Sequence, residues 1–159
     1  MQRIAKFEYV SEAQFAAAFD GNTPAYPDLP RRATTGSAGY DFFTPVPIHL
    51  APGETAKIPT GIRCRMEDGW VLQIFPRSGL GFKFRLQLNN TVGIIDSDYY
   101  YSDNEGHIFI KITNDSNEGK TLDLPAGAAF AQGIFMQYGI TEDDCVDAVR
   151  NGGLGSTSK

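Results

Sequence analysis

Short runs of alternating apolar and polar residues recur along most of the chain. In the clearest run, residues 58–66 (IPTGIRCRM), Ile62, Cys64 and Met66 alternate with two arginines. A period of two is typical of a half-buried β-strand. Comparable β-type runs lie at 1–10, 70–75, 84–88, 92–95, 107–113 and 134–138. Turn residues separate these runs at intervals of about 8–12 residues, which predicts an all-β sandwich, barrel or jelly roll.

One segment near the start of the chain has a helical pattern instead. Ser11, with Gln14 three residues later, resembles a capping box, and an apolar run follows at 15–19. We therefore expect a short helix near 11–20 that ends near Gly21, and no other helix. The chain to residue 148 is expected to form one β domain. Residues 149–159, rich in Gly and Ser, are expected to form a mobile arm.

The composition fits one globular domain. A length of 159 residues is typical of one domain, and a hydrophobic content of 42% is too high for an intrinsically disordered chain. No apolar run approaches the ~20 residues that would span a bilayer. The chain does not open on a basic segment followed by an apolar one, so we expect a cytoplasmic location. Two cysteines far apart in the sequence argue against a disulfide framework or a metal cluster.

Charge changes this picture in one respect. The net charge of −5 argues against binding of long nucleic acid over the whole surface. The charges are unevenly spread, because residues 31–90 carry eight Lys/Arg and four Asp/Glu, whereas residues 101–159 carry four and nine. A cationic middle in an acidic protein can receive a small anion such as phosphate. The same counts also fit a mixed, solvated surface.

Five segments carry side chains that a plain β domain does not need. They are 36–42 (GSAGYDF), 76–83 (PRSGLGFK), 90–99 (NTVGIIDSDY), 127–135 (GAAFAQGIF) and 150–158 (RNGGLGSTS). In the second, a glycine-rich bend lets Arg77 and Ser78 donate hydrogen bonds to an oxyanion. In the third, a buried strand carries Asp96 to its end, where a carboxylate can orient and deprotonate water. Each segment alone also fits an ordinary turn, a sheet edge or a free terminus.

In their order and number, these segments resemble the five motifs of the homotrimeric dUTPases (dUTP diphosphatases). The matches are SAGYD (37–41), PRSGLG (76–81), NNTVGIIDSDY (89–99), AAFAQ (128–132) and GGLGSTS (152–158). The resemblance implies an all-β, distorted jelly-roll fold, the dUTPase-like β-clip. It implies a homotrimer whose active sites lie between subunits and hydrolyse dUTP to dUMP and pyrophosphate with Mg²⁺. Such an enzyme limits uracil incorporation into DNA and supplies dUMP for thymidylate synthesis.

The resemblance also implies a role for individual residues. Asp96 would activate the water that attacks the α-phosphorus, and Tyr99 would pack on the deoxyribose. Asp41 would support the shell of water around a Mg²⁺ ion that the phosphates hold, without a direct protein ligand. The phosphate contacts would come from Arg77, Ser78, Gly79, Gln132 and Arg150. The uracil would be read by Asn90 and the backbone of Gly93, Ile94 and Ile95, while the arm, with Leu154 and Gly155, closes over the site.

The chain departs from the family pattern at three places. Leu154 stands where the family has an aromatic residue that stacks on uracil, and Ala128 and Ala129 replace a charged pair. Residues 100–104 are an insertion that can be a solvated loop or a surface for a protein partner. These departures leave two alternatives to an active dUTPase. One is a catalytically weak homologue that senses nucleotides or binds a partner, and the other is a relative of the dCTP deaminases.

Overall fold

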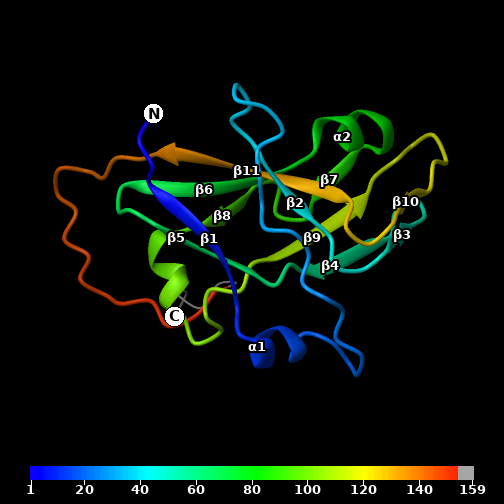
Figure 1. Ribbon diagram of the computed structural model, residues 1–159. Coiled ribbons are helices and arrows are strands. Elements are labelled where there is room, and N and C mark those ends of the chain that lie inside the picture. The colour runs from blue at the N-terminus through cyan, green and yellow to red at the C-terminus, as the bar shows by residue number, and fades with distance from the viewer. Residues whose placement is uncertain (154–159) are drawn as a thin grey trace.

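The structure is a computed structural model that describes residues 1–153. Its strands are short, as the alternating runs predict, and three helical segments interrupt them (Figure 1). The strands are β1 (Ala5–Tyr9), β2 (Tyr40–Phe43), β3 (Ile48–Leu50), β4 (Thr55–Pro59), β5 (Ile62–Met66), β6 (Trp70–Pro76), β7 (Leu86–Leu88), β8 (Gly93–Ile95), β9 (Phe109–Asn114), β10 (Leu122–Leu124) and β11 (Ala129–Gln137). The helices are α1 (Glu12–Ala16), α2 (Ser78–Phe84) and the 3₁₀ turn η1 (Ser97–Tyr101).

The strands pair antiparallel and form four small sheets. Their orders are β1-β5, β3-β10, β2-β11-β6-β8 and β4-β9-β7. The four-stranded sheet brings together segments far apart in the sequence, because β11 lies between β2 and β6. This layout confirms the predicted all-β jelly-roll-like fold, and it places four of the five motif segments on or beside one sheet.

The core contains the apolar face of the runs at 58–66, 70–75, 84–88 and 107–113, whereas the run at 134–138 has no buried residue. In β5, Ile62, Cys64 and Met66 are buried while Arg65 is exposed, as the period of two predicts. The run 58–66 is nevertheless two strands and not one, because the chain turns at Gly61 with φ +72°. The Phe15 ring packs against Gly61, where an added β-carbon would lie only 3.0 Å from it. Burial of a large apolar side chain stabilises the fold by about 1.5–3 kcal/mol.

The helix prediction was right in place and wrong in extent. Helix α1 begins after Ser11, whose hydroxyl accepts a hydrogen bond from the Gln14 backbone N–H at 3.1 Å. The helix ends at Ala16, four residues before the expected end, in a tighter turn in which Phe19 N bonds to Ala16 O. Helix α2 was not predicted, because two glycines within SGLGFKF give it low helix propensity.

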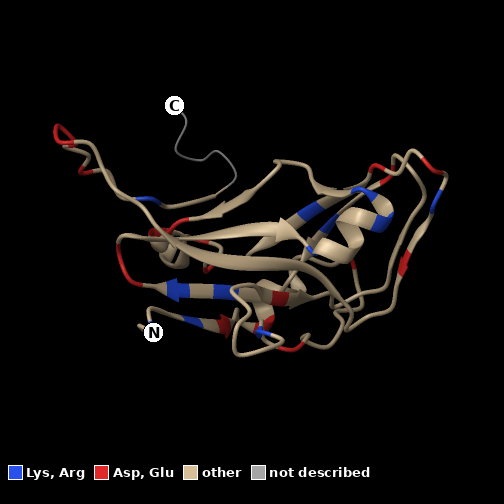
Figure 2. Ribbon diagram, turned by 90° about the horizontal axis from the view of Figure 1, so that it is seen from above, with Lys and Arg blue, Asp and Glu red and all other residues tan. Residues whose placement is uncertain are grey.

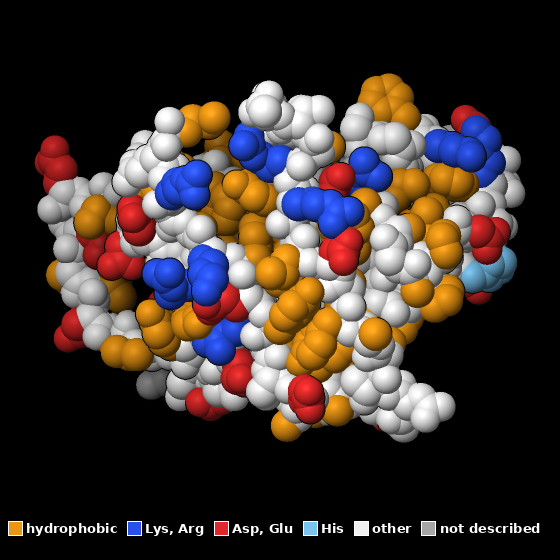
Figure 3. Space-filling model, viewed as in Figure 1, with side chains coloured by type: hydrophobic (Ala, Val, Ile, Leu, Met, Phe, Trp, Pro, Cys, Tyr) orange, Lys and Arg blue, Asp and Glu red, His pale blue; other side chains and the backbone are white. Residues whose placement is uncertain are grey.

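In the view of Figure 1, positive, negative and apolar side chains are intermixed on the surface. Neither the basic nor the acidic side chains form one continuous patch there (Figure 3). Beyond β11 the chain runs along the outside of the domain, and its acidic residues at 142–147 stand away from the sheets (Figure 2). Among residues 1–153, no helix has the length and apolar character that a membrane crossing requires.

Candidate active site

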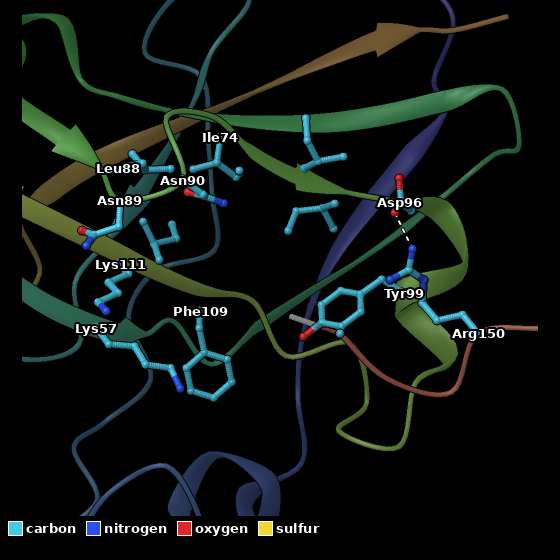
Figure 4. A pocket seen from close by; sticks show the side chains of 15 residues that line it. Lys57, Ile74, Leu88, Asn89, Asn90, Asp96, Tyr99, Phe109, Lys111 and Arg150 are labelled. Atoms are coloured by element: carbon cyan, nitrogen blue, oxygen red, sulfur yellow. Dashed lines mark hydrogen bonds and ion pairs between the residues drawn. The ribbon is translucent and has the colours of Figure 1, made fainter. Parts of the chain in front are cut away.

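A pocket of about 450 Å³ collects Asp96 and the residues predicted to contact the nucleoside. Its lining includes Asn90, Gly93, Ile94, Ile95, Asp96, Tyr99, Arg150 and Gly153. Figure 4 shows Asp96 and Arg150 at one end of the pocket, and Lys57, Lys111 and Phe109 at the other. We refer to it as the Asp96 pocket.

The strand β8 forms one wall of the Asp96 pocket because glycine lets it lie close to β6. Gly93 pairs with Ile74, and a β-carbon on Gly93 would lie 3.0 Å from that of Ile74. The strand then ends at Ile95, and Asp96 follows in extended conformation as the N-cap of η1. The prediction that a short strand carries Asp96 at its end is therefore confirmed, but the strand is not buried as expected, because Ile94 is 52% exposed and only Gly93 is buried.

Asp96 forms an ion pair with the arm. The Arg150 Nη2 atom donates to Asp96 Oδ2 at 2.5 Å, and Arg150 Nε donates to Asp98 Oδ1 at 2.8 Å. The Arg150 side chain is only 19% exposed, so both contacts are partly shielded from water. Arg150 thus occupies one of the two oxygens through which Asp96 can accept a proton.

Tyr99 is held rigidly between η1 and the next strand. Its hydroxyl donates to the backbone carbonyl of His107 at 2.7 Å and accepts from the Asn104 amide at 2.8 Å. Burial raises the pKa of Tyr99, so the phenol remains a neutral donor at physiological pH. The ring lines the pocket, and Gly153 approaches it so closely that a β-carbon there would collide with it.

A second pocket, of about 390 Å³, collects the other predicted residues. Asp41, Arg77, Ser78, Gly79 and Gln132 all line it, and we refer to it as the Arg77 pocket. The Arg77 Nε atom lies 3.0 Å from Asp41 Oδ1, and the Gln132 amide donates to the carbonyl of Pro76 at 3.0 Å. The glycine-rich bend predicted at 76–83 is the start of α2, with Ser78 and Gly79 exposed in its first turn. Guanidinium and hydroxyl donors at an open pocket suit a phosphate group.

The two pockets share no lining residue. One chain therefore separates Asp96 from four of the five phosphate donors that the resemblance assigns to the same reaction, and only Arg150 lies beside Asp96. Leu154 and Gly155 lie outside the described residues. Within residues 1–153, no three His, Cys, Asp or Glu side chains cluster so that they could hold a metal ion.

Sequence reasoning missed the basic end of the Asp96 pocket, where Lys57, Asn89, Phe109 and Lys111 lie. The signal was present in the run HIFIKIT, since its alternation places Phe109 and Lys111 on the same outward face. His107 is fully buried and accepts a hydrogen bond from the Gly61 N–H at 2.9 Å.

Comparison with known proteins agrees with the sequence motifs. The dUTPase family model matches residues 25–158. The deoxyuridine 5′-triphosphate nucleotidohydrolase of Lactococcus lactis is 40% identical over 82% of this chain and 87% of its own length. The deoxyuridine 5′-triphosphate nucleotidohydrolase of Hahella chejuensis is 41% identical over 81% of this chain and 86% of its own length.

Solved structures show the same fold. The dUTPase of Streptococcus mutans superposes with a TM-score of 0.66 and 34% identity, covering 86% of this chain and 98% of that one. The dUTPase of phage phi11 of S. aureus, at 22% identity, covers 92% and 97% with a TM-score of 0.67. The family match spans most of the chain and includes all five motif segments. The chain therefore belongs to the dUTPase family and is an enzyme of the dUTP diphosphatase class.

Proposed function

We propose that this chain hydrolyses dUTP to dUMP and pyrophosphate by in-line attack of a water molecule on the α-phosphorus. The observation that supports the proposal is that the two pockets of the chain hold different functional groups. The Asp96 pocket holds a carboxylate base beside the residues that would read the nucleoside, whereas the Arg77 pocket holds donors for phosphate oxygens. The reaction needs both sets at one substrate.

A homotrimer would unite the two sets. In a cyclic trimer, each subunit contacts its neighbours through two different surfaces, and this contact repeats at each interface. We propose that one of these surfaces carries the Asp96 pocket and the other carries the Arg77 pocket. Residues 1–148 would form the body of each subunit, and residues 149–159 would act as an arm that closes over the assembled site.

The mechanism requires positioning and charge stabilisation more than covalent chemistry. Asp96 would take a proton from the water while the water oxygen attacks the α-phosphorus. On the opposite side, the bond between the α-phosphorus and the oxygen of the leaving pyrophosphate would break. Arg77, Ser78 and the backbone N–H of Gly79 would stabilise the charge on the phosphate oxygens, with Gln132 as a further contact. Arg150 would leave Asp96 and bind the γ-phosphate.

The residues present fit a magnesium ion bound mainly through the substrate. Mg²⁺ prefers oxygen ligands and keeps several waters, usually with one or two carboxylates and substrate phosphates. Asp41 places a carboxylate in the same pocket as Arg77 and Ser78, so it can accept a hydrogen bond from a water of an ion that the substrate phosphates hold. When bound, Mg²⁺ would neutralise charge on the triphosphate. The solved structure of a phage phi11 dUTPase variant is described with a structural Mg(II) ion.

The geometry of the Asp96 pocket favours deoxyuridine. Asn90 and the backbone of β8 offer both donors and acceptors to the edge of a base, and a mismatched cytosine would leave buried polar groups unpaired. The fixed ring of Tyr99 would pack against the deoxyribose and leave no room for a 2′-hydroxyl. The phage 80α dUTPase has been solved with dUpNHpp. Hydrolysis of dUTP would limit uracil in DNA and supply dUMP for thymidylate synthesis.

The first test measures pyrophosphate release from dUTP with Mg²⁺ by wild type and Asp96→Asn, with dCTP and UTP as control substrates. We expect turnover of dUTP alone, and a loss of at least about 100-fold in the variant because its general base is removed. Binding of dUTP without turnover by the folded wild type would support a nucleotide sensor instead.

The second test asks whether two chains share one site. Asp96→Asn and Arg77→Gln are each expected to be inactive, and the two are unfolded together and refolded. If every site takes Asp96 from one subunit and Arg77 from another, random assembly restores about a quarter of the sites. A mixture that stays as inactive as its components would contradict the shared site.

A further inference from the structure

The basic end of the Asp96 pocket carries an unusual pair of charges. Lys57 of β4 and Lys111 of β9 lie directly opposite each other in the antiparallel register, and both are exposed on the outer face of the sheet. Like charges directly opposite in a sheet destabilise it. Both side chains also line the pocket. Something else must therefore favour two ammonium groups at this position.

No carboxylate among residues 1–153 neutralises these lysines. Lys6 and Lys120 each pair with a glutamate, whereas neither Lys57 nor Lys111 takes part in an ion pair. Asp115, the acid nearest to the end of β9 in sequence, is engaged by Arg85 at 2.8 Å. Lys57 has partial compensation, because its Nζ atom lies 4.5 Å from the centre of the Phe109 ring. Within the described residues, Lys111 has no such contact.

A fixed amide donor completes the cluster. The Thr55 and Thr113 hydroxyls are 2.7 Å apart, and Thr113 donates to the Asn89 Oδ1 atom at 2.8 Å. This chain of hydrogen bonds orients the Asn89 amide, whose oxygen is used while its Nδ2 group has no acceptor within residues 1–153. The Asn89 backbone N–H bonds to the carbonyl of Lys111, which fixes the two residues side by side.

We propose that Lys57, Lys111 and the Asn89 amide form a binding site for a phosphate-type oxyanion. Two ammonium groups and an NH₂ donor, with no acid beside them, match a tetrahedral anion that carries two negative charges. The site lies at the opposite end of the pocket from Asp96 and does not depend on the proposed hydrolysis. Inorganic phosphate and pyrophosphate share this chemistry and are the two ligands to compare.

The experiment measures thermal unfolding of the full chain with phosphate or pyrophosphate, against sodium chloride at equal ionic strength. At ten times the dissociation constant, the folding equilibrium shifts about elevenfold, which raises Tm by about 3–6 °C. We expect this rise in wild type and in Lys120→Gln, a matched lysine control, and its loss in Lys57→Gln/Lys111→Gln. The oxyanion that binds more tightly identifies the ligand.

Two further variants separate this site from the catalytic one. Arg77→Gln removes a donor of the proposed catalytic phosphate site, and the rise in Tm that remains in this background should be lost when Lys57→Gln/Lys111→Gln is added. Lys111→Gln alone should raise Tm in anion-free, low-salt buffer, because it removes the repulsion between the opposed lysines. The proposal is overturned if the double variant responds to phosphate as wild type does, or if sodium chloride reproduces the whole effect.

Discussion

Arg150 pairs with two aspartates in the structure and is proposed to bind phosphate during the reaction. Replacing it shows which of these two interactions has the larger effect on activity. In the structure it pairs with Asp96 at 2.5 Å and with Asp98 at 2.8 Å. In the proposed reaction it binds the γ-phosphate instead. The perturbation is Arg150→Gln, which keeps the length of the side chain approximately and removes its charge. It frees Asp96 and at the same time deletes a phosphate contact.

The magnitudes of the two effects differ. The two acids are 45% and 53% exposed, so the pair resembles a surface ion pair, which contributes at most about 1 kcal/mol. A charge-assisted hydrogen bond to phosphate contributes about 1.5–3 kcal/mol. Freeing Asp96 can therefore gain at most about fivefold, whereas losing the phosphate contact costs about 10- to 150-fold. The loss is larger, so kcat/KM for dUTP should fall while Tm changes by less than about 4 °C.

Steady-state kinetics with dUTP and thermal unfolding check this prediction together. Arg85→Gln is the matched control, because it removes a guanidinium from a similar exposed pair with Asp115 and touches neither pocket lining. We expect the control to keep the wild-type kcat/KM. A rise in kcat/KM for Arg150→Gln would refute the reasoning. It would mean that the ion pair inhibits Asp96 and that Arg150 makes no contact with the substrate that offsets this inhibition.

The remaining predictions concern the fold behind Tyr99. Burial lowers the pKa of His107 to about 4, so the unfolded chain binds a proton between pH 6.5 and 4 that the folded chain does not. Stability should therefore fall by about 2 kcal/mol between pH 7.5 and 5 in urea titrations, and His107→Gln should lose most of this dependence. Gly106→Ala should cost at least about 2 kcal/mol and impair dUTP binding, because at φ +70° its β-carbon would lie 2.7 Å from Tyr100 Cα. Gly119→Ala, also at φ +70° but in open space, should cost about 1 kcal/mol; equal losses would contradict the argument from steric contact.

The sequence predicted the strands well where one face is buried and the other solvated. In β5 the alternation identifies the inward residues correctly, because a period of two needs no knowledge of distant contacts. Helix α2 could not be found in this way. It has two glycines and one buried residue, Phe84, and ends at Arg85 in the left-handed conformation. Such a helix depends on its neighbours more than on its own propensity.

The candidate site was predictable as a set of residues and not as an arrangement. The motifs identify Asp96 and Arg77, but nothing in their spacing shows that they line separate pockets. The capping box at Ser11 illustrates the same limit. Its hydroxyl accepts from Gln14 N as predicted, whereas the partner of the Ser11 N–H is Glu105, 94 residues away, at 3.3 Å. Contacts of this separation follow from the fold and not from local pattern.

The N-terminal segment and the insertion after Tyr99 support each other. The family match begins at residue 25, so β1 and α1 lie outside it. Their polar contacts nevertheless converge on the insertion and the residue that follows it: Glu8 accepts from the Tyr100 hydroxyl at 2.6 Å, and Ser11 donates to Glu105 at 2.7 Å.

The insertion in turn fixes the tyrosine proposed to hold the sugar, because Asn104 donates to the Tyr99 hydroxyl. Part of the insertion is therefore structural, whereas Tyr101, which is 73% exposed, and the exposed Asp103 are available to a partner. A protein partner at 100–104 stays a prediction. A partner that displaced β1 would free Tyr100, and one that displaced α1 would free Glu105. Either change would loosen the segment that carries Tyr99 in the Asp96 pocket.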